Sequence, residues 1–344
     1  MSNTCRECFS EYASPVDVVT VKPALGICAF CNGETGDVWP ATTWAALFQS
    51  VVEAYTPIVD APSPDDALHR RLQEDWGLFA FEDDAEGSGA EAFLKAVFHD
   101  VPDVLAQSAF VSPLVAKGHA QEWDDFTRDV TEVNRYFPKS SLDLEFLARV
   151  INENLRPISQ GTKLYRARLG PTRSPLPVSE MGRPPVDMAR QGRANPVGIP
   201  HLYLALSEQT AIYESRAEQH AYVSVATFLV DTPCRVLNLA GLRPDNPFLS
   251  LDNLAQRLDS WRLLDRLGQE LSRPVRSGDN KLEYIPTQYL SEYVKSLGID
   301  GILFGSSLDV DGRNLVLFTE DNVHIEPNVA CFDVTSNRLE YRRL

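Results

Sequence analysis
Six arginines stand in the segment 166–193, which carries only two acidic residues, Glu180 and Asp187. The guanidinium fork binds phosphate groups in bidentate fashion, so this cluster suits a small, doubly charged anion such as a pyrophosphate. A single glutamate, Glu214, follows within reach and is expected to be buried. Arginines together with one carboxylate are the groups that a nucleotide-cleaving site needs. The six arginines are Arg166, Arg168, Arg173, Arg183, Arg190 and Arg193.

The rest of the chain is acidic, with 32 Lys+Arg against 48 Asp+Glu and a formal net charge of −16. The negative electrostatic field of such a chain repels polyanions, so we do not expect nucleic acid or an anionic membrane as a partner. The sequence has no apolar run of about 18 residues, and its start lacks the charged-then-apolar plan of a signal peptide. We therefore expect a cytoplasmic protein.

Four of the six cysteines form the pattern C-x2-C-x19-C-x2-C, at Cys5, Cys8, Cys28 and Cys31. Each C-x2-C turn presents two thiolates, and two such turns complete the tetrahedron of a zinc ribbon. Disulfides are the weaker interpretation in a reducing compartment, and four free thiols are the remaining alternative. Four protein ligands leave no open position, so the expected Zn²⁺ is structural.

The elements that must position these groups can be predicted from apolar periodicity. Between residues 42 and 155 apolar residues mostly recur at intervals of three and four, which predicts a unit of four or five helices. Further helices are expected over the leucine-rich segment 253–273 and over 282–299, where Pro286 suits a first turn and Gly298 an end.

Strand-like segments surround the arginines and the glutamate. In KLYRARLG, residues 163–170, alternation places Arg166 and Arg168 on one face and Tyr165 on the other. The run HLYLAL then carries Tyr203. After it, Ser207 is expected to cap a helix that contains Glu214.

The segment 299–318 reads as two apolar strands joined by a polar turn at Asp311-Gly312, which is a hairpin signal. Ser306 is expected to end the first strand, beside Gly305, where a backbone can approach a ligand closely.

From residue 164 to residue 318 the sequence resembles the RES family, which is named for an arginine, a glutamate and a serine. The resemblance implies a fold similar to ADP-ribosyltransferase toxins and an action on NAD. Family members cleave the nicotinamide–ribose bond by hydrolysis or phosphorolysis, and many are the toxin half of bacterial toxin–antitoxin pairs. The pieces that carry it are LYRA at 164–167, GRANPVGIPHLYLA at 192–205, TAIYE at 210–214, PTQYLSEYVK at 286–295 and DGILFGSS…GRNLVLF at 300–318.

By family position the resemblance implies four catalytic residues, Arg166, Tyr203, Glu214 and Ser306. Arg166 is assigned to the NAD phosphates. The Tyr203 ring is expected to stack on nicotinamide, and its hydroxyl to bind a ribose or a phosphate. Ser306 is given a binding role, with Ser307 as the close second. The expected substrate-binding residues are Tyr165, Arg168, Arg193, Ser307 and Asn314.

The expected fold class is α+β, in three parts. Residues 1–40 form the zinc ribbon, residues 41–157 a helical domain, and residues 158–344 an ADP-ribosyltransferase-like mixed β core with covering helices. Helical extensions of RES proteins are often compared to the HEPN class. The Arg-x4–6-His motif of HEPN ribonucleases is not found here, so this domain is expected to be catalytically silent and to serve packing, dimerisation or control.

The leading functional prediction is an NAD glycohydrolase or phosphorylase of toxin or antiviral-defence type. One alternative is an ADP-ribosyltransferase that modifies a macromolecule, and another is a non-catalytic nucleotide-binding zinc-ribbon adaptor. No G-x-G-x-x-G is present, so NAD is expected as substrate and not as redox cofactor. An antitoxin or regulatory protein is the expected partner type, and a homo-oligomer is compatible with the sequence.

Overall fold
The computed structural model describes residues 2–31, 35–57, 67–80, 89–101, 110–111, 118–274 and 281–336. Their contacts divide the chain into two compact units. Unit 1 comprises Met1–Gly118 and Arg243–Arg262, and unit 2 comprises His119–Leu242 and Leu263–Leu344. Helix α7 (Leu254–Ser272) is shared, because its first residues belong to unit 1 and its last to unit 2.

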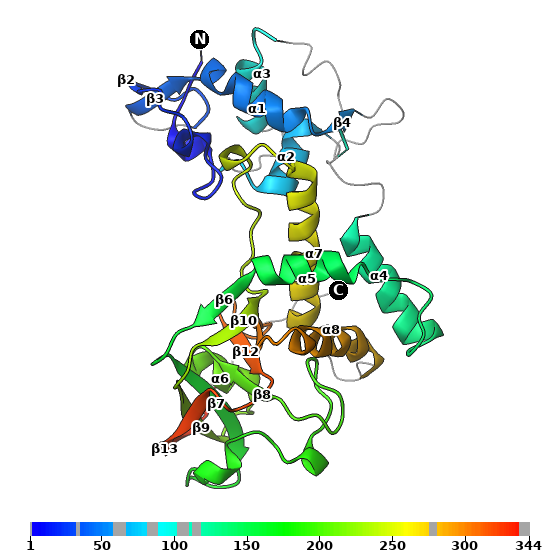
Figure 1. Cartoon of the computed structure of the whole chain (residues 1–344). Coiled ribbons are helices and arrows are strands. Elements are labelled where there is room, and N and C mark those ends of the chain that lie inside the picture. The colour runs from blue at the N-terminus through cyan, green and yellow to red at the C-terminus, as the bar shows by residue number, and fades with distance from the viewer. Residues whose placement is uncertain are drawn as a thin grey trace. The chain divides into compact units, whose positions relative to one another are not determined.

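Unit 1 contains the four N-terminal cysteines and the helices α1, α2 and α3, which Figure 1 labels. One core holds Cys8, Phe9, Trp44, Phe48 and Phe93, so the cysteine-bearing turns pack against the helices that follow them. The Phe9 ring meets Trp44 and Phe93 edge-on, with centroids 5.9 and 5.3 Å apart. The elements are β1 (Asn3–Thr4), β2 (Ala24–Gly26), β3 (Gly36–Pro40), α1 (Ala45–Val52), β4 (Thr56–Pro57), α2 (Leu68–Trp76), α3 (Gly89–Val97) and β5 (Phe110–Val111). The strands form a sheet of order β1-β3-β2 and a pair β4-β5.

Unit 2 is built on an eight-stranded sheet of order β13-β9-β7-β8-β12-β11-β10-β6. All neighbours are antiparallel except β10 and β11. The strands are β6 (Leu155–Ile158), β7 (Lys163–Gly170), β8 (Leu202–Ala205), β9 (Tyr222–Val230), β10 (Cys234–Asn238), β11 (Gly301–Gly305), β12 (Arg313–Leu317) and β13 (Val323–Asp333). The helices are α4 (His119–Arg128), α5 (Leu144–Glu153), α6 (Glu208–Glu214) and α8 (Ile285–Ser296), and a π-helical turn, Asp129–Val133, follows α4.

The sheet of unit 2 is open at its centre. Along β7 and β9 eight residue pairs are in register, but β7 and β8 share only the pair Tyr165↔Ala205. Beyond that pair the two strands diverge, and side chains of both strands become available to a cavity between them.

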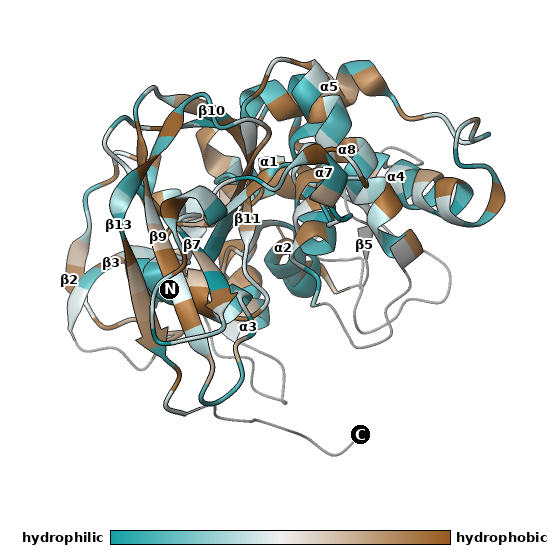
Figure 2. Cartoon of the chain, turned by 90° about the horizontal axis from the view of Figure 1, so that it is seen from below, coloured by the Kyte–Doolittle hydropathy of each residue, from teal (hydrophilic) through white to brown (hydrophobic). Residues whose placement is uncertain are grey.

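Period-2 alternation divides the sheet residues between two cores. Ile302 and Phe304 pack with α4, α5, α7 and α8 on one side, whereas Leu303 packs in a second core on the other. Figure 2 shows hydrophobic residues, coloured brown, along β9 of this sheet. Helix α6 packs against β7, β8 and β9, and Ile212 and Tyr165 pack against the same small apolar cluster.

The predicted α+β class is confirmed, including a mixed β core with covering helices. Three local predictions also hold. The Ser207 side chain accepts the backbone N–H of Thr210 at the start of α6, β11 and β12 form the predicted hairpin, and Pro286 stands in the first turn of α8. The three-part division at residues 40 and 157 stays a prediction. The structure groups α4 and α5 with the eight-stranded sheet, and the four N-terminal cysteines with α1–α3.

No helix within the described ranges is both long and apolar enough to cross a membrane.

Candidate active site
A cavity of about 400 Å³ lies at the opening between β7 and β8. All of its lining residues belong to unit 2. Eight of the nine residues predicted for catalysis or substrate binding can be related to it directly. Tyr165, Arg166, Arg193, Tyr203, Glu214, Ser307 and Asn314 line the cavity, and Ser306 contacts Glu214.

Glu214 is the centre of a small hydrogen-bonded group. Its Oε1 accepts the Ser306 hydroxyl at 2.6 Å and the Asn314 side-chain amide at 2.7 Å. Ser306 directly follows β11 and Asn314 belongs to β12, so the predicted hairpin delivers both donors to the last residue of α6. No hydrogen bond joins Oε2 to another residue in the described part of the chain, which leaves that oxygen for a ligand.

The expectation that Glu214 is buried was wrong, because its side chain is exposed. It is the last residue of its helix and lies at the cavity wall, not under the sheet. The exposed carboxylate is held in place by Ser306 and Asn314 and not by burial.

Ser306 and Ser307 have different surroundings. The Ser306 hydroxyl donates to Glu214 and accepts the backbone N–H of Leu308 at 3.1 Å. Ser307 is exposed and lines the cavity. The geometry thus gives Ser306 the place of a group that orients the glutamate, and Ser307 a place where a ligand can touch it.

Arg166 is largely desolvated in the cavity wall. Burial, followed by repulsion from Arg168, lowers the pKa of Arg166 to about 10, so the guanidinium keeps its charge at neutral pH. One nitrogen donates to the carbonyl of Tyr203 at 3.3 Å, and Nε is buried without a hydrogen-bond partner among the described residues. A charged donor in this state favours an anionic ligand.

Tyr203 supports the loop that carries Arg193. Its hydroxyl donates to Asn195 Oδ1 at 2.7 Å and accepts the backbone N–H of Ala194 at 3.1 Å, while burial raises the pKa of Tyr203. The loop passes so closely that a Cβ at Gly192 would lie 2.6 Å from this hydroxyl. The ring lines the cavity while the hydroxyl is engaged by the loop.

Helix α8 holds the same loop from the other side. Gln288 donates to the carbonyls of Gly192 and Asn195, and the Thr287 hydroxyl donates to the carbonyl of Arg193. The Arg193 guanidinium donates to the carbonyl of Glu270 at 2.9 Å and lies 5.3 Å from the centre of the Tyr284 ring. Arg193 is therefore fixed at its backbone and its side chain together.

Other arginines of the segment 166–193 do not line this cavity within the described structure. Arg168, predicted to bind substrate, donates to the carbonyl of Glu180. Arg173 donates to the Tyr222 hydroxyl. Arg183 donates to the carbonyls of Pro200 and Phe318.

Two arginines that sequence reasoning missed take their place, Arg216 and Arg273. Arg216 follows α6 by two residues, with φ of 51°, and Arg273 follows α7 and pairs with Glu283 at 3.2 Å. Nearness to Glu214 could have pointed to Arg216. No motif marks Arg273 or the ring of Tyr284, which also lines the cavity.

Replacing Tyr203 with phenylalanine is expected to lower the free energy of unfolding by roughly 1–3 kcal/mol, because the buried Ala194 N–H loses its acceptor. Thermal unfolding measures this. Tyr222→Phe is the matched control, since the Tyr222 hydroxyl accepts a hydrogen bond from the exposed side chain of Arg173 and, within the described residues, from no buried backbone group. Unchanged stability in Tyr203→Phe would contradict the supporting role.

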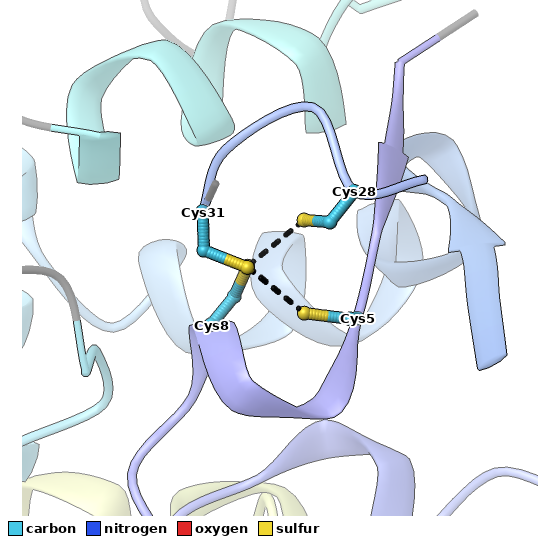
Figure 3. A group of neighbouring side chains, drawn as sticks. All are labelled: Cys5, Cys8, Cys28 and Cys31. Carbon is cyan, nitrogen blue, oxygen red and sulfur yellow. Dashed lines mark hydrogen bonds between the residues drawn. The ribbon is translucent and has the colours of Figure 1, made fainter. Parts of the chain in front are cut away.

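The four N-terminal cysteines also come together. Their Sγ atoms all lie within 4.8 Å of one another, and the side chains point toward a common centre (Figure 3). The Sγ pairs Cys5–Cys31, Cys8–Cys28 and Cys5–Cys8 are 3.2, 3.3 and 3.7 Å apart. This arrangement could hold a metal ion with four sulfur ligands.

Unit 2 is thus an α+β domain with a single positioned glutamate in an arginine-lined cavity. Residues 163–337 match the RES domain family, and the chain belongs to that family. No curated protein matches the chain. Among solved structures it is similar to a chain in the crystal structure of the M. tuberculosis MbcT–MbcA toxin–antitoxin complex. The identity is 18%, the TM-score is 0.32, and the match covers 56% of this chain and 93% of that one.

Proposed function
We propose that this RES-domain protein cleaves the nicotinamide–ribose bond of NAD, by hydrolysis or phosphorolysis. The observation that carries the proposal is the Glu214 carboxylate, held by Ser306 and Asn314 at the wall of a cavity that also holds four arginines. The four are Arg166, Arg193, Arg216 and Arg273.

Cleavage of the nicotinamide–ribose bond needs one negative charge from the protein. As the bond between ribose C1′ and nicotinamide lengthens, the ribose gains oxocarbenium character, as in glycoside hydrolysis. Nicotinamide leaves as a neutral molecule, so no general acid is needed. The Glu214 carboxylate can stabilise the positive charge or hold the ribose hydroxyls through Oε2, because its two donors occupy Oε1.

The arginines would bind the pyrophosphate of the substrate. A pyrophosphate carries two negative charges, and guanidinium groups bind it with charge-assisted hydrogen bonds. Arg166 suits this role because it is desolvated and charged. Binding there would place the reacting ribose near the single carboxylate of the cavity.

The test is to incubate the purified protein with NAD, with and without inorganic phosphate, and to follow nicotinamide and ADP-ribose products by chromatography. Release without phosphate indicates a glycohydrolase, and dependence on phosphate indicates a phosphorylase. Release only when a protein or nucleic-acid acceptor is added would indicate an ADP-ribosyltransferase. If NAD binds but no nicotinamide is released under any of these conditions, the protein is a non-catalytic nucleotide-binding module and the proposal is contradicted.

Ser306→Ala is expected to lower kcat by about tenfold, because Glu214 loses a hydrogen bond that orients it. Ser307→Ala is the neighbouring comparison and is expected to raise KM with little change in kcat. Steady-state kinetics on NAD separates the two. If only Ser307→Ala lowers kcat, the family serine has been placed one residue too early.

The same proposal includes Zn²⁺ in unit 1. The residues fit this ion, since four thiolates are a soft, closed ligand set with C-x2-C spacing. Bound there, zinc would stabilise the fold and have no place in the reaction. Because an enzyme that consumes NAD endangers its own cell, a restraining partner of the antitoxin kind also belongs to the proposal.

A further inference from the structure
A second cavity, of about 680 Å³, adjoins the first in unit 2. The two share Arg193, Ser272 and Arg273 in their walls. The second cavity lies between the end of α4 with its π-helical turn, the end of α7 and the start of α8. At about 400 Å³ the first cavity is near the lower end of the range for ligand sites, which is small for a whole dinucleotide.

One wall of the second cavity comes from outside the family match. Thr127, Thr131 and Glu132 line it, and all precede residue 163, where the match begins. Thr131 and Glu132 belong to the π-helical turn Asp129–Val133, an irregularity that is frequent at functional sites. This wall therefore lies outside the part of the chain that matches the RES domain family.

Two polar groups of this wall are not engaged by the described protein. The Thr127 hydroxyl is buried without a hydrogen-bond partner among the described residues. The exposed Glu132 carboxylate forms no hydrogen bond or ion pair within the same set. A buried hydroxyl without a partner is costly, and Thr127 lines the cavity, so a ligand that draws this hydroxyl toward it would supply the missing partner.

We propose that the second cavity binds the adenosine half of the dinucleotide, with Thr127 and Glu132 as recognition residues. The inference rests on the proposed action on NAD. Arg193 and Arg273 line both cavities and Arg166 lines the first, so a pyrophosphate bound by these three arginines would have one nucleoside on each side.

The composition of the cavity suits adenosine. Pro274, Leu282 and Pro286 offer apolar surface to the base. Adenosine presents an exocyclic amine and ribose hydroxyls as donors, and the Glu132 carboxylate can only accept. The nicotinamide riboside would then occupy the first cavity, where Glu214 lies.

Thr127→Val and Glu132→Gln test this assignment, with Glu145→Gln on the exposed side of α5 as the matched control. Both test variants are expected to raise the KM for NAD and to weaken binding of ADP, measured by calorimetry, by about tenfold each. Release of nicotinamide from nicotinamide mononucleotide, which lacks adenosine, should stay unchanged. The melting temperature of Thr127→Val should not fall, since the removed hydroxyl has no partner.

The outcomes separate this inference from the proposed function. If NAD is cleaved but both variants bind ADP and NAD like the wild type, the adenosine site is overturned and the NAD activity stands. If no NAD is cleaved but ADP binding weakens in both variants and not in Glu145→Gln, the site stands and the proposed activity fails. Failure of the wild type to bind ADP, or an equal loss with nicotinamide mononucleotide, would also overturn the site.

Discussion
Glu214→Gln is expected to lower the turnover of NAD by about two to three orders of magnitude, the effect typical of removing one group that stabilises charge in the transition state. Glutamine keeps the shape of the side chain, and its carbonyl oxygen can still accept from Ser306 and Asn314. The substitution therefore removes the negative charge and leaves the surroundings intact. Quantified nicotinamide release under saturating NAD measures it.

Glu208→Gln is the matched control, because Glu208 is an exposed glutamate of the same helix that does not line the cavity within the described structure. Its turnover should equal that of the wild type. Melting temperatures of both variants should also match the wild type. If Glu214→Gln turns over NAD at the wild-type rate, the carboxylate is not the catalytic charge and the proposed mechanism fails.

The position of this carboxylate depends on three parts of the fold. Helix α6 begins at the Ser207 cap and ends at Glu214, and the β11–β12 hairpin brings in Ser306 and Asn314. The Thr210 hydroxyl also donates to Asp309 in the hairpin turn at 2.6 Å. The start of α6 is thus tied to the hairpin whose other residues hold the end of α6.

Local patterns in the sequence were sufficient to predict these parts separately. The alternation in 163–170, the cap at Ser207 and the turn at Asp311-Gly312 each depend on neighbouring residues alone. Their meeting at Glu214 follows from the order of the family motifs, which residues 163–337 confirm as a RES domain. Local sequence patterns and the order of the motifs were therefore sufficient to predict most of the residues that the structure places at the candidate site.

The remaining parts depend on pairing and packing between distant segments. The cavity lies where β7 and β8 share only one residue pair, and no periodicity predicts where two paired strands diverge. Arg168 has the strand position expected for a phosphate-binding residue, yet its guanidinium donates to the backbone carbonyl of Glu180. Arg273 reaches the cavity from the end of α7, a helix whose sequence carries only an ordinary apolar face.

Cys8→Ser is expected to abolish zinc binding and to unfold unit 1. Structural zinc contributes about 10–16 kcal/mol of apparent binding free energy, comparable to the whole stability of a domain at about 5–15 kcal/mol. Cys8 is fully buried and shares its core with Phe9, Trp44 and Phe48, so loss of the metal site removes packing from the helices as well. Metal analysis and scanning calorimetry measure the two effects.

Cys331→Ser is the matched control, because Cys331 lies on β13 in unit 2, outside the four-cysteine group. It should retain zinc equivalent to a single ion per chain and the calorimetric transitions of the wild type. Treating the wild type with a strong chelator should reproduce the Cys8→Ser result, and added zinc should restore the lost transition only in the wild type. A Cys8→Ser protein that keeps both its zinc and its transitions would show that these cysteines do not hold a structural metal. Because the cysteine turns and α1–α3 share one core, the same loss should expose the buried tryptophan Trp44, which fluorescence would report.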